Sequence, residues 1–257
     1  MQQPPYRNPI GTPFIELQSV DSTNNYAREQ IPAGLAQHGT AVFAHEQTAG
    51  KGQRGRVWTS EKGSNIALSV MVKPQPLLVS QQFQLSACMA LAVLDFFSKY
   101  AGEDASIKWP NDLYWQDRKA GGILIESIIG SRGSGTAEWE WAIVGVGINI
   151  NQTSFPPHLP NPVSLKQITG NDHQVPELAK ELCGFMEKYL QELTRSGFEN
   201  IYRKYNLHLY KRNETVRLKK DNRSFDVMIK RISPAGKLVV QHSIEEEFDF
   251  GEVEWVI

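Results

Sequence analysis

A short segment rich in glycine and cations, Gly50-Lys51-Gly52-Gln53-Arg54-Gly55-Arg56, is the first part of the chain that could do chemistry. Its glycines let backbone N–H groups approach an anion closely, and Lys51, Arg54 and Arg56 add positive charge. The segment also satisfies G-x-G-x-x-G, but a dinucleotide site needs a helix directly after the third glycine, and Val57-Trp58-Thr59-Ser60 predicts none. A site for a phosphate or carboxylate and an ordinary solvated basic turn both remain open at this point.

Three further segments carry residues that suit a ligand site. Lys108-Trp109-Pro110-Asn111-Asp112 presents an amide and a carboxylate where the proline interrupts extended chain. Asp117 to Gly122 is a charged turn that leads into an apolar strand. Gly145-Val146-Gly147-Ile148-Asn149 has two glycines near the end of a strand, which suggests close approach by a ligand or another backbone. Taken singly, the first two segments are better explained as ordinary turns.

The elements that must position these segments change character along the chain. Alternating and β-branched runs predict strands, and the stretch from residue 80 to 97, apolar on nearly every side, predicts a helix buried against a sheet. After about Asn213 only short strands separated by turns are expected, which favours a small β-barrel. Before that point we expect strands at 14–17, 40–45, 65–72, 122–126 and 139–149, and helices from 25, 80, 175 and 198.

The composition narrows the class of protein. There are 27 basic and 28 acidic residues among 257, and this balance gives no support to a protein that coats nucleic acid. Cys88 and Cys183 lie in apolar stretches without a partner at metal-ligand spacing, so we interpret them as buried structural thiols. The first five residues do not form a signal peptide, and the run from Ala87 to Leu94 is too short to cross a bilayer. We therefore expect a cytoplasmic protein.

In identity, order and spacing the segments resemble the biotin-protein ligase family. The resemblance covers roughly residues 14 to 150, and five ordered motifs make it specific. The motifs are Ser22-Thr23-Asn24, the loop from Gly50 to Arg56 with Glu46-Gln47-Thr48-Ala49 before it and Trp58 after it, Lys108 to Asp112, Lys119 to Glu126, and Gly145 to Asn149. Since the first motif begins at residue 22, the form expected is the one without an N-terminal DNA-binding domain.

The resemblance implies an α+β fold. Residues 1–210 would form a catalytic domain with a mixed β-sheet flanked by helices, like that of class II synthetases, and residues 211–257 a small SH3-like domain. The activity implied is a ligase that forms biotinyl-5'-AMP from biotin and ATP, the latter as its Mg²⁺ complex, and then transfers biotin to a lysine of a biotin carboxyl carrier protein. No DNA partner, membrane partner or directly ligated metal is expected, and a homodimer is left open.

The resemblance also implies roles for individual residues. Lys119 would lie at the biotin carboxylate and the α-phosphate, with Arg54 and Arg56 in a loop that covers the ligand. Asp112 would orient or deprotonate the acceptor amine, although a carboxylate at a strand end is equally often a turn residue. The biotin-binding set is Ser22, Thr23, Asn24, Gln47, Gly50, Lys51, Gln53, Arg54, Lys119 and Gly122. The ATP-binding and adenylate-binding set is Arg54, Arg56, Trp58, Asn111, Lys119 and Asn149, and Trp58 is nearly as well explained as a core tryptophan.

Two departures and two alternatives accompany this hypothesis. Lys51 and Gln53 stand where many relatives carry arginine, which lowers the positive charge of the loop and predicts a weaker hold on the adenylate. A lipoate-protein ligase is the alternative enzyme, although Lys108 to Asp112 and the glycine-arginine loop count against it. A vitamin-responsive repressor is the alternative of a different class, and the near-neutral charge counts against it.

Overall fold

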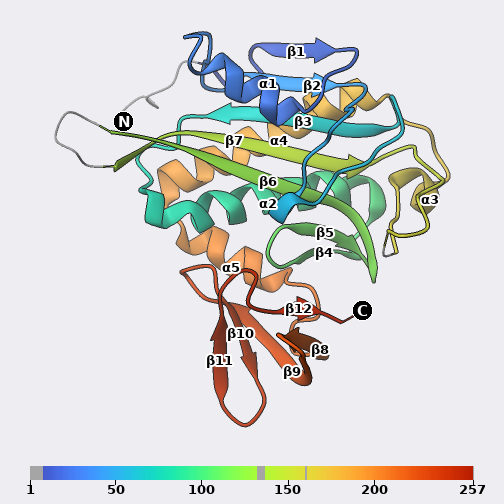
Figure 1. Cartoon of the computed structure of the whole chain (residues 1–257), viewed down its shortest axis with the longest axis vertical. Helices are drawn as coiled ribbons and strands as arrows, with labels where there is room; N and C mark the ends of the chain where they lie inside the picture. Colours follow the sequence, from blue (N-terminus) through green and yellow to red (C-terminus); the bar gives the residue numbers. More distant parts are fainter. Residues whose placement is uncertain (1–7, 132–136, 160, 257) are drawn as a thin grey trace.

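The structure, a computed structural model, describes residues 8–131, 137–159 and 161–256. This described part forms two sheets, and Figure 1 shows the smaller one at one end of the long axis. The larger sheet has the strand order β1-β2-β3-β7-β6-β5-β4, in which β1 and β2 are parallel and all other neighbours antiparallel. Its strands are β1 (Phe14–Leu17), β2 (Ala41–Ala44), β3 (Asn65–Val72), β4 (Ala105–Lys108), β5 (Asp112–Trp115), β6 (Arg118–Ser131) and β7 (Ala137–Asn149).

Different helices pack on the two faces of the larger sheet. On β3, Ile66, Leu68 and Val70 join the main apolar core, which includes α2 and α4. Because side chains alternate along a strand, Ser69 and Met71 point to the opposite face, where Met71 packs with residues of α1 in a smaller apolar cluster. One face of the larger sheet is therefore covered by α2 and α4, and the other face carries α1.

The helices follow from the apolar pattern of the chain. α2 (Gln82–Ala101) is buried along most of its length between the sheet and α4 (Val175–Ser196), whose outer side is polar. Both helices end at a glycine with positive φ, Gly102 at 79° and Gly197 at 76°, a conformation that glycine adopts without strain. The remaining helical segments are α1 (Thr23–Gln30), η1 (Gln53–Gly55), η2 (Val79–Gln81), α3 (Leu165–Thr169) and α5 (Glu199–Leu207).

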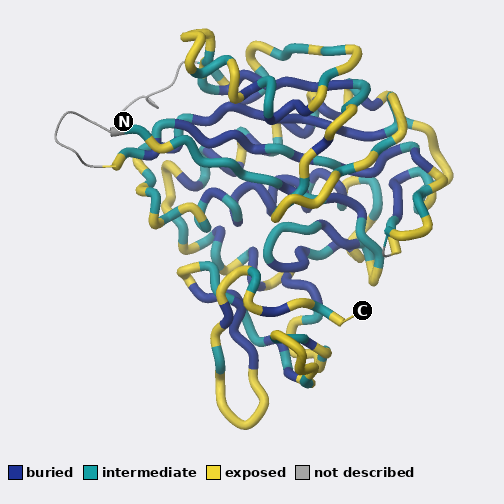
Figure 2. The backbone as a smooth tube through the Cα atoms, viewed as in Figure 1, coloured by how far each residue is buried: buried dark blue, intermediate teal, exposed yellow. Residues whose placement is uncertain are grey.

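The smaller sheet is antiparallel and follows α5. Figure 2 shows buried chain at the centre of both sheets and exposed chain at the hairpin tip between β10 and β11. Leu218, Val227 and Phe248 belong to the same apolar core as the larger sheet, so the hydrophobic interior runs from one sheet into the other without a break. The strand order is β11-β10-β9-β8-β12, formed by β8 (Thr215–Lys220), β9 (Arg223–Ile232), β10 (Leu238–Gln241), β11 (Glu245–Phe248) and β12 (Glu254–Trp255).

The predicted α+β architecture is confirmed, with differences at the ends of elements. The strand expected at 122–126 begins at Arg118 and continues to Ser131, because residues 118–122 pair with β5 and residues 121–131 pair with β7. Cys88 and Cys183 are both buried, as expected for structural thiols. Among the helices of the described residues, none combines the length and the apolarity that crossing a membrane requires.

Candidate active site

Lys119 and Asp112 form an ion pair at one end of the larger sheet. The Lys119 Nζ lies 2.6 Å from the Asp112 Oδ1, and both side chains are partly exposed. Asp112 opens β5 and Lys119 lies near the start of β6, the neighbouring strand. A Cβ on Gly122 would lie 3.2 Å from the same carboxylate oxygen, so glycine leaves room for the pair. A cation and a carboxylate thus lie together at a point that a ligand can reach.

Asn111 is held in the turn before β5. Its Nδ2 donates to the Ile123 carbonyl at 2.6 Å, while the Ile123 N–H donates to the Asn111 carbonyl at 2.9 Å. The two bonds fix the backbone next to Asp112. As the proline predicts, the strand ends at Lys108, and the chain turns there in a tight hairpin in which Lys108 pairs with Asp112.

Lys108, to which sequence reasoning gave no role, is a buried cation beside this pair. Only 5 % of the residue is exposed. Its Nζ donates to the Tyr114 hydroxyl at 3.1 Å and lies 4.5, 5.0 and 5.7 Å from the ring centroids of Tyr114, Trp255 and Tyr210. Burial lowers the pKa of Lys108 to about 8; Asp112 opposes the shift, and Lys119 and Arg56 add to it. These cations therefore act on one another electrostatically.

The glycine-rich loop is closed by its own backbone bonds. Gly52 N donates to the Arg56 carbonyl at 2.7 Å, and Trp58 N to the Gly50 carbonyl at 2.9 Å. A Cβ on Gly50 would lie 2.4 Å from the Trp58 carbonyl oxygen, so this position requires glycine. Lys51 donates to the Asn25 side chain, which lies in the first turn of α1.

Trp58 packs flat against the sheet over Gly147. A Cβ on Gly147 would come within 2.6 Å of the Trp58 ring, and one on Gly145 within 2.4 Å of Asn24 Oδ1. The two glycines were expected to admit a ligand or another backbone, and in the structure they admit these two side chains. The Trp58 Nε1 and the Gln53 Oε1 are buried atoms without a hydrogen-bond partner among the described residues.

The two arginines of the glycine-rich loop, Arg54 and Arg56, lie near different parts of the protein. Arg56 is exposed and influences the pKa of Lys108 and Tyr114, so it acts near the Lys119 and Asp112 pair. Arg54, which has a left-handed backbone (φ 55°), reaches the smaller sheet instead. Its Nη1 donates to the Gly251 carbonyl at 3.2 Å and its guanidinium lies 5.6 Å from the Phe250 ring centroid.

Ser22, Thr23 and Gln47 meet at the start of α1. Ser22 is the residue before the helix and is buried. The Gln47 Oε1 accepts from the Thr23 N–H at 2.8 Å and lies 3.1 Å from the Thr23 hydroxyl. Asn24, on the next position, is buried against the sheet and donates to Glu126. The structure thus brings Gln47 together with Ser22 and Thr23, whereas Arg54, which was expected in the same set, contacts the smaller sheet.

Asn149 is buried, and its amide already has protein partners. The Nδ2 donates to the Val163 carbonyl at 3.1 Å and to the Lys119 carbonyl at 3.4 Å. These bonds tie the end of β7 to the strand that carries Lys119. In this structure Asn149 therefore supports Lys119, and its Oδ1 is the atom left for the nucleotide contact that the resemblance implied.

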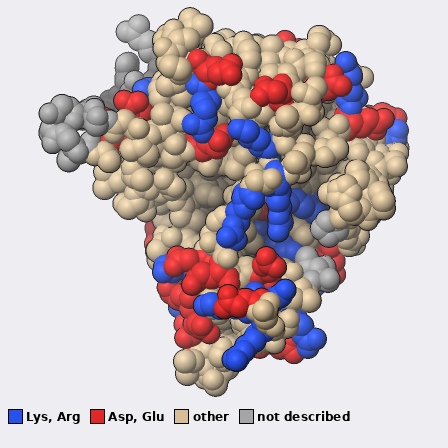
Figure 3. Space-filling view, in the orientation of Figure 1, with Lys and Arg blue, Asp and Glu red and all other residues tan. Residues whose placement is uncertain are grey.

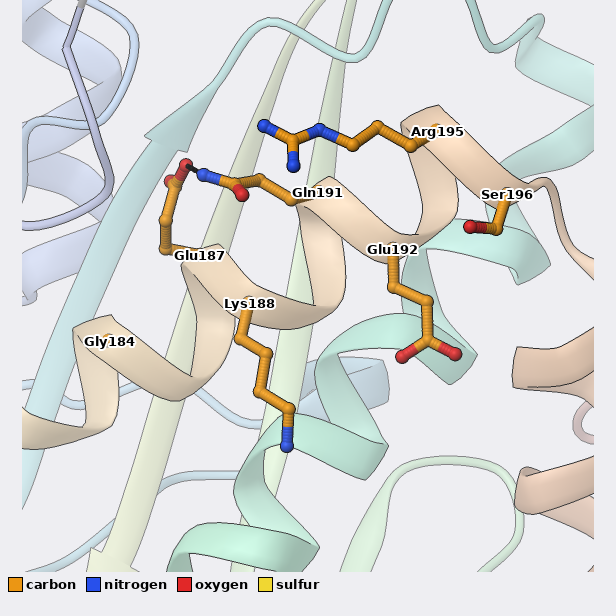
Figure 4. Close-up of a pocket in the computed structure, with 7 residues that line it drawn as sticks. All are labelled: Gly184, Glu187, Lys188, Gln191, Glu192, Arg195 and Ser196. Atoms are coloured by element: carbon orange, nitrogen blue, oxygen red, sulfur yellow. Dashed lines mark hydrogen bonds between the residues drawn. The ribbon is translucent and has the colours of Figure 1, made fainter.

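The gathering of positive charge on the surface, and not the hollow along α4, coincides with the motif residues. Figure 3 shows Lys and Arg side chains gathered on the middle of one face, between the larger sheet and an acidic region of the smaller one. A hollow of about 490 Å³ lies along α4, and Figure 4 shows the side chains that line it. None of these residues belongs to a motif; they are Gly184, Glu187, Lys188, Gln191, Glu192, Arg195 and Ser196.

Comparison with known proteins agrees with the motifs. Residues 16–149 match the model of the biotin/lipoate A/B protein ligase family. The biotin-[acetyl-CoA-carboxylase] ligase of Paracoccus denitrificans is 35 % identical over 192 residues, which cover 72 % of this chain and 76 % of that protein. The bifunctional ligase/repressor BirA of Bacillus spizizenii is 34 % identical over 75 % of this chain, and the match spans 58 % of that longer relative.

Solved structures give the same result for the fold. The biotin protein ligase from Aquifex aeolicus in complex with biotin and ATP superposes with a TM-score of 0.78 at 26 % identity, covering 94 % of this chain and 97 % of that one. The biotin protein ligase from Leishmania major in complex with biotinyl-5-AMP has a TM-score of 0.62 at 23 % identity, covering 96 % and 100 %. The coverage includes both sheets, so the likeness extends beyond the matched motifs.

Proposed function

This chain belongs to the biotin/lipoate A/B protein ligase family, and we propose that it joins biotin to ATP as biotinyl-5'-AMP and then transfers the biotin to a lysine of a biotin carboxyl carrier protein. The observation that carries the proposal is the ion pair of Lys119 and Asp112, 2.6 Å apart, with Arg56 and the buried Lys108 in electrostatic range. Cations gathered beside a single carboxylate suit a reaction that brings two anions together.

In the first half-reaction a carboxylate oxygen of biotin attacks the α-phosphorus of ATP and pyrophosphate leaves. Lys119 is proposed to bind both anions and to stabilise the charge that develops on the phosphoryl oxygens. Arg56 adds positive charge on the solvent side. Donors preorganised in this way contribute about 3–4 kcal/mol each to lowering such a barrier. ATP enters as its Mg²⁺ complex, and the Oδ1 atoms of Asn111 and Asn149 are the neutral oxygens proposed to face it.

In the second half-reaction the neutral amine of the acceptor lysine attacks the acyl carbon of the mixed anhydride, and AMP leaves with the bonding electrons. The amine must lose a proton as the amide forms. Asp112 is proposed to orient the amine and accept this proton through the oxygen that does not contact Lys119. No covalent intermediate with the enzyme is needed.

The remaining assignments follow the resemblance. The ureido ring of biotin is proposed to meet Ser22, Thr23 and Gln47, which lie together at the start of α1. Trp58 is proposed to support the adenylate from its place on Gly147. Residues 1–210 would be the catalytic domain and 211–257 the SH3-like domain. Because ATP is a substrate, the cytoplasm is the proposed location.

The test is ATP-pyrophosphate exchange followed by transfer to a purified biotin carrier domain. Exchange that depends on biotin, with lipoate inactive, is the expected result, together with labelling of one lysine of the carrier. Exchange driven by lipoate and not by biotin would establish the alternative ligase. Absence of exchange with either acid would reject adenylation altogether.

A further inference from the structure

A buried row of polar groups runs from β6 to the start of α1. Asn24 Nδ2 donates to Glu126 Oε2 at 2.7 Å, and Asn24 Oδ1 lies 2.6 Å from the Ser69 hydroxyl oxygen. That hydroxyl in turn lies 2.7 Å from the Thr23 hydroxyl oxygen, which is 3.1 Å from Gln47 Oε1. Ser69, Thr23 and Asn24 are at most 3 % exposed, so water contributes little to these contacts.

The atoms at the two ends of the row, Glu126 Oε2 and Gln47 Oε1, both accept hydrogen bonds. The Glu126 carboxylate has no proton to give, so it selects the amide orientation in which Asn24 turns its Nδ2 to Glu126 and its Oδ1 to Ser69. At the other end, the Thr23 N–H donates to Gln47 Oε1 at 2.8 Å, which fixes that oxygen toward Thr23.

Three oxygen-oxygen contacts then remain, and only two protons, those of the Ser69 and Thr23 hydroxyl groups, are available to form hydrogen bonds in them. The three are Ser69 to Asn24 Oδ1, Ser69 to Thr23, and Thr23 to Gln47 Oε1. The shortest contact, at 2.6 Å, becomes a hydrogen bond when Ser69 donates to Asn24 Oδ1. The next shortest, at 2.7 Å, becomes one when Thr23 donates to the Ser69 oxygen. With these two shorter contacts filled, the Thr23 proton is used inside the protein, and Thr23 offers a ligand lone pairs and no proton.

The fold makes room for this row at one specific point. Ser69 on β3 pairs with Gly145 on β7, and Glu126 on β6 pairs with Ile143 two residues away on the same face. A Cβ on Gly145 would lie 2.4 Å from Asn24 Oδ1, so the amide fits only over glycine. The amide is therefore held where it can reach Glu126 and Ser69 at once.

We propose that Glu126 is a positioning residue that sets the direction of these hydrogen bonds and so makes Thr23 select a ligand that presents an N–H group to it. The inference rests on the proposed function, in which the biotin ureido ring meets Thr23. A ring oxygen in place of that N–H would face a second set of lone pairs in a nearly dry site, and such a mismatch is strongly disfavoured.

The experiment compares biotin with the two carbamate analogues in which one or other ureido N–H is replaced by oxygen. The readout is the ratio of kcat/KM for biotin to that for the poorer analogue in pyrophosphate exchange. For the unaltered enzyme we expect a ratio of about 100. Glu126→Ala lets the Asn24 amide turn over, so that Ser69 donates to Thr23, and Ser69→Ala removes the acceptor of the Thr23 proton. In both variants the longer contact to Gln47 Oε1, at 3.1 Å, is the one protein acceptor in the row that remains for this proton, and a ligand can compete for it. Each variant should lower the ratio at least about tenfold.

Arg28→Ala is the matched control. Arg28 is the other partner of Glu126, at 2.8 Å, but it is 45 % exposed and lies outside the row. Its loss should leave the ratio unchanged, and thermal unfolding would verify that each variant is folded. An unchanged ratio in both Glu126→Ala and Ser69→Ala, even with lower activity on biotin and analogue alike, would overturn the proposal. If the unaltered enzyme forms no biotinyl-adenylate, the proposed function fails first and by a different measurement.

Discussion

Replacing Lys108 with methionine leaves an unbranched side chain one atom shorter and removes the charge from a buried site lined by aromatic rings. The amine lies 4.5 to 5.7 Å from the ring centroids of Tyr114, Trp255 and Tyr210. Burial lowers its pKa from 10.5 to about 8, and Asp117, like Asp112, acts against this shift. The folded protein therefore binds this proton less tightly than the unfolded chain does.

The size of the effect follows from that shift. A drop from 10.5 to about 8 corresponds to about 3 kcal/mol against the charged form at pH 7. Methionine removes this cost but gives up the attraction between the amine and the rings, about 1–2 kcal/mol in total. The variant should be more stable than the unaltered protein at pH 7 by about 1–2 kcal/mol.

The pH dependence has a definite sign. Between about pH 8 and 10.5 the unfolded chain retains a proton on Lys108 that the folded protein has released, so the free energy of unfolding rises with pH there. Methionine does not titrate, so the difference in unfolding free energy that favours the variant should decrease by up to about 3 kcal/mol between pH 8 and 10.5.

The assay is urea unfolding followed by tryptophan fluorescence at pH 7 to 10.5. Lys62→Met, at a side chain that is 59 % exposed, controls for the loss of a lysine as such. A difference in unfolding free energy between Lys108→Met and the unaltered protein that stays constant over the whole range would refute the reasoning. So would a variant that is less stable at pH 7.

Three further predictions concern the formation of the adenylate, its release and the binding of ATP. Lys119→Ala should slow adenylate formation about a hundredfold or more in single-turnover assays, since it removes a donor at the phosphoryl group, and a rate within a few-fold of normal would remove Lys119 from that role. Gln53→Arg should slow adenylate release about ten- to a hundredfold in stopped-flow measurements if a charge-assisted bond forms, whereas equal rates would take Gln53 off the ligand surface. Gly147→Ala should raise the KM for ATP at least about tenfold, because the added Cβ would lie 2.6 Å from the Trp58 ring and displace it. An unaltered KM would show that Trp58 does not contribute to nucleotide binding.

Much of the fold could be predicted because the apolar pattern is strong where burial is complete. Every residue of β3 is buried, and α2 is apolar on nearly all sides, so both elements could be found from composition alone. The start of β6 was missed because residues 118–121 begin with two cations and end in glycine. Their extended conformation comes from pairing with β5, which includes a bulge next to Tyr114, and no local pattern encodes that pairing.

The candidate site was predictable only as far as residue types signal their own chemistry. Lys119, Asp112 and the loop arginines could be identified in their motifs. Glu126 stands in a motif as well, yet its partner Asn24 is 102 residues away, so its role depends on the fold. Lys108 likewise acquires its environment from Trp255, near the other end of the chain.

The contact between Arg54 and Gly251 joins two segments 197 residues apart, and it bears on when the enzyme becomes complete during its synthesis. The loop emerges from the ribosome before the carbonyl that holds its arginine, which follows 197 residues later next to the Phe250 ring. A nascent chain can pair β1 to β7 and bury α2 while Arg54 still has no anchor. Closing so long a loop costs little more than closing a shorter one, because the entropy grows only with the logarithm of length. Order of synthesis therefore makes the smaller sheet join the site after the larger one, and a chain that ends before residue 250 has all its motifs but lacks both contacts of Arg54.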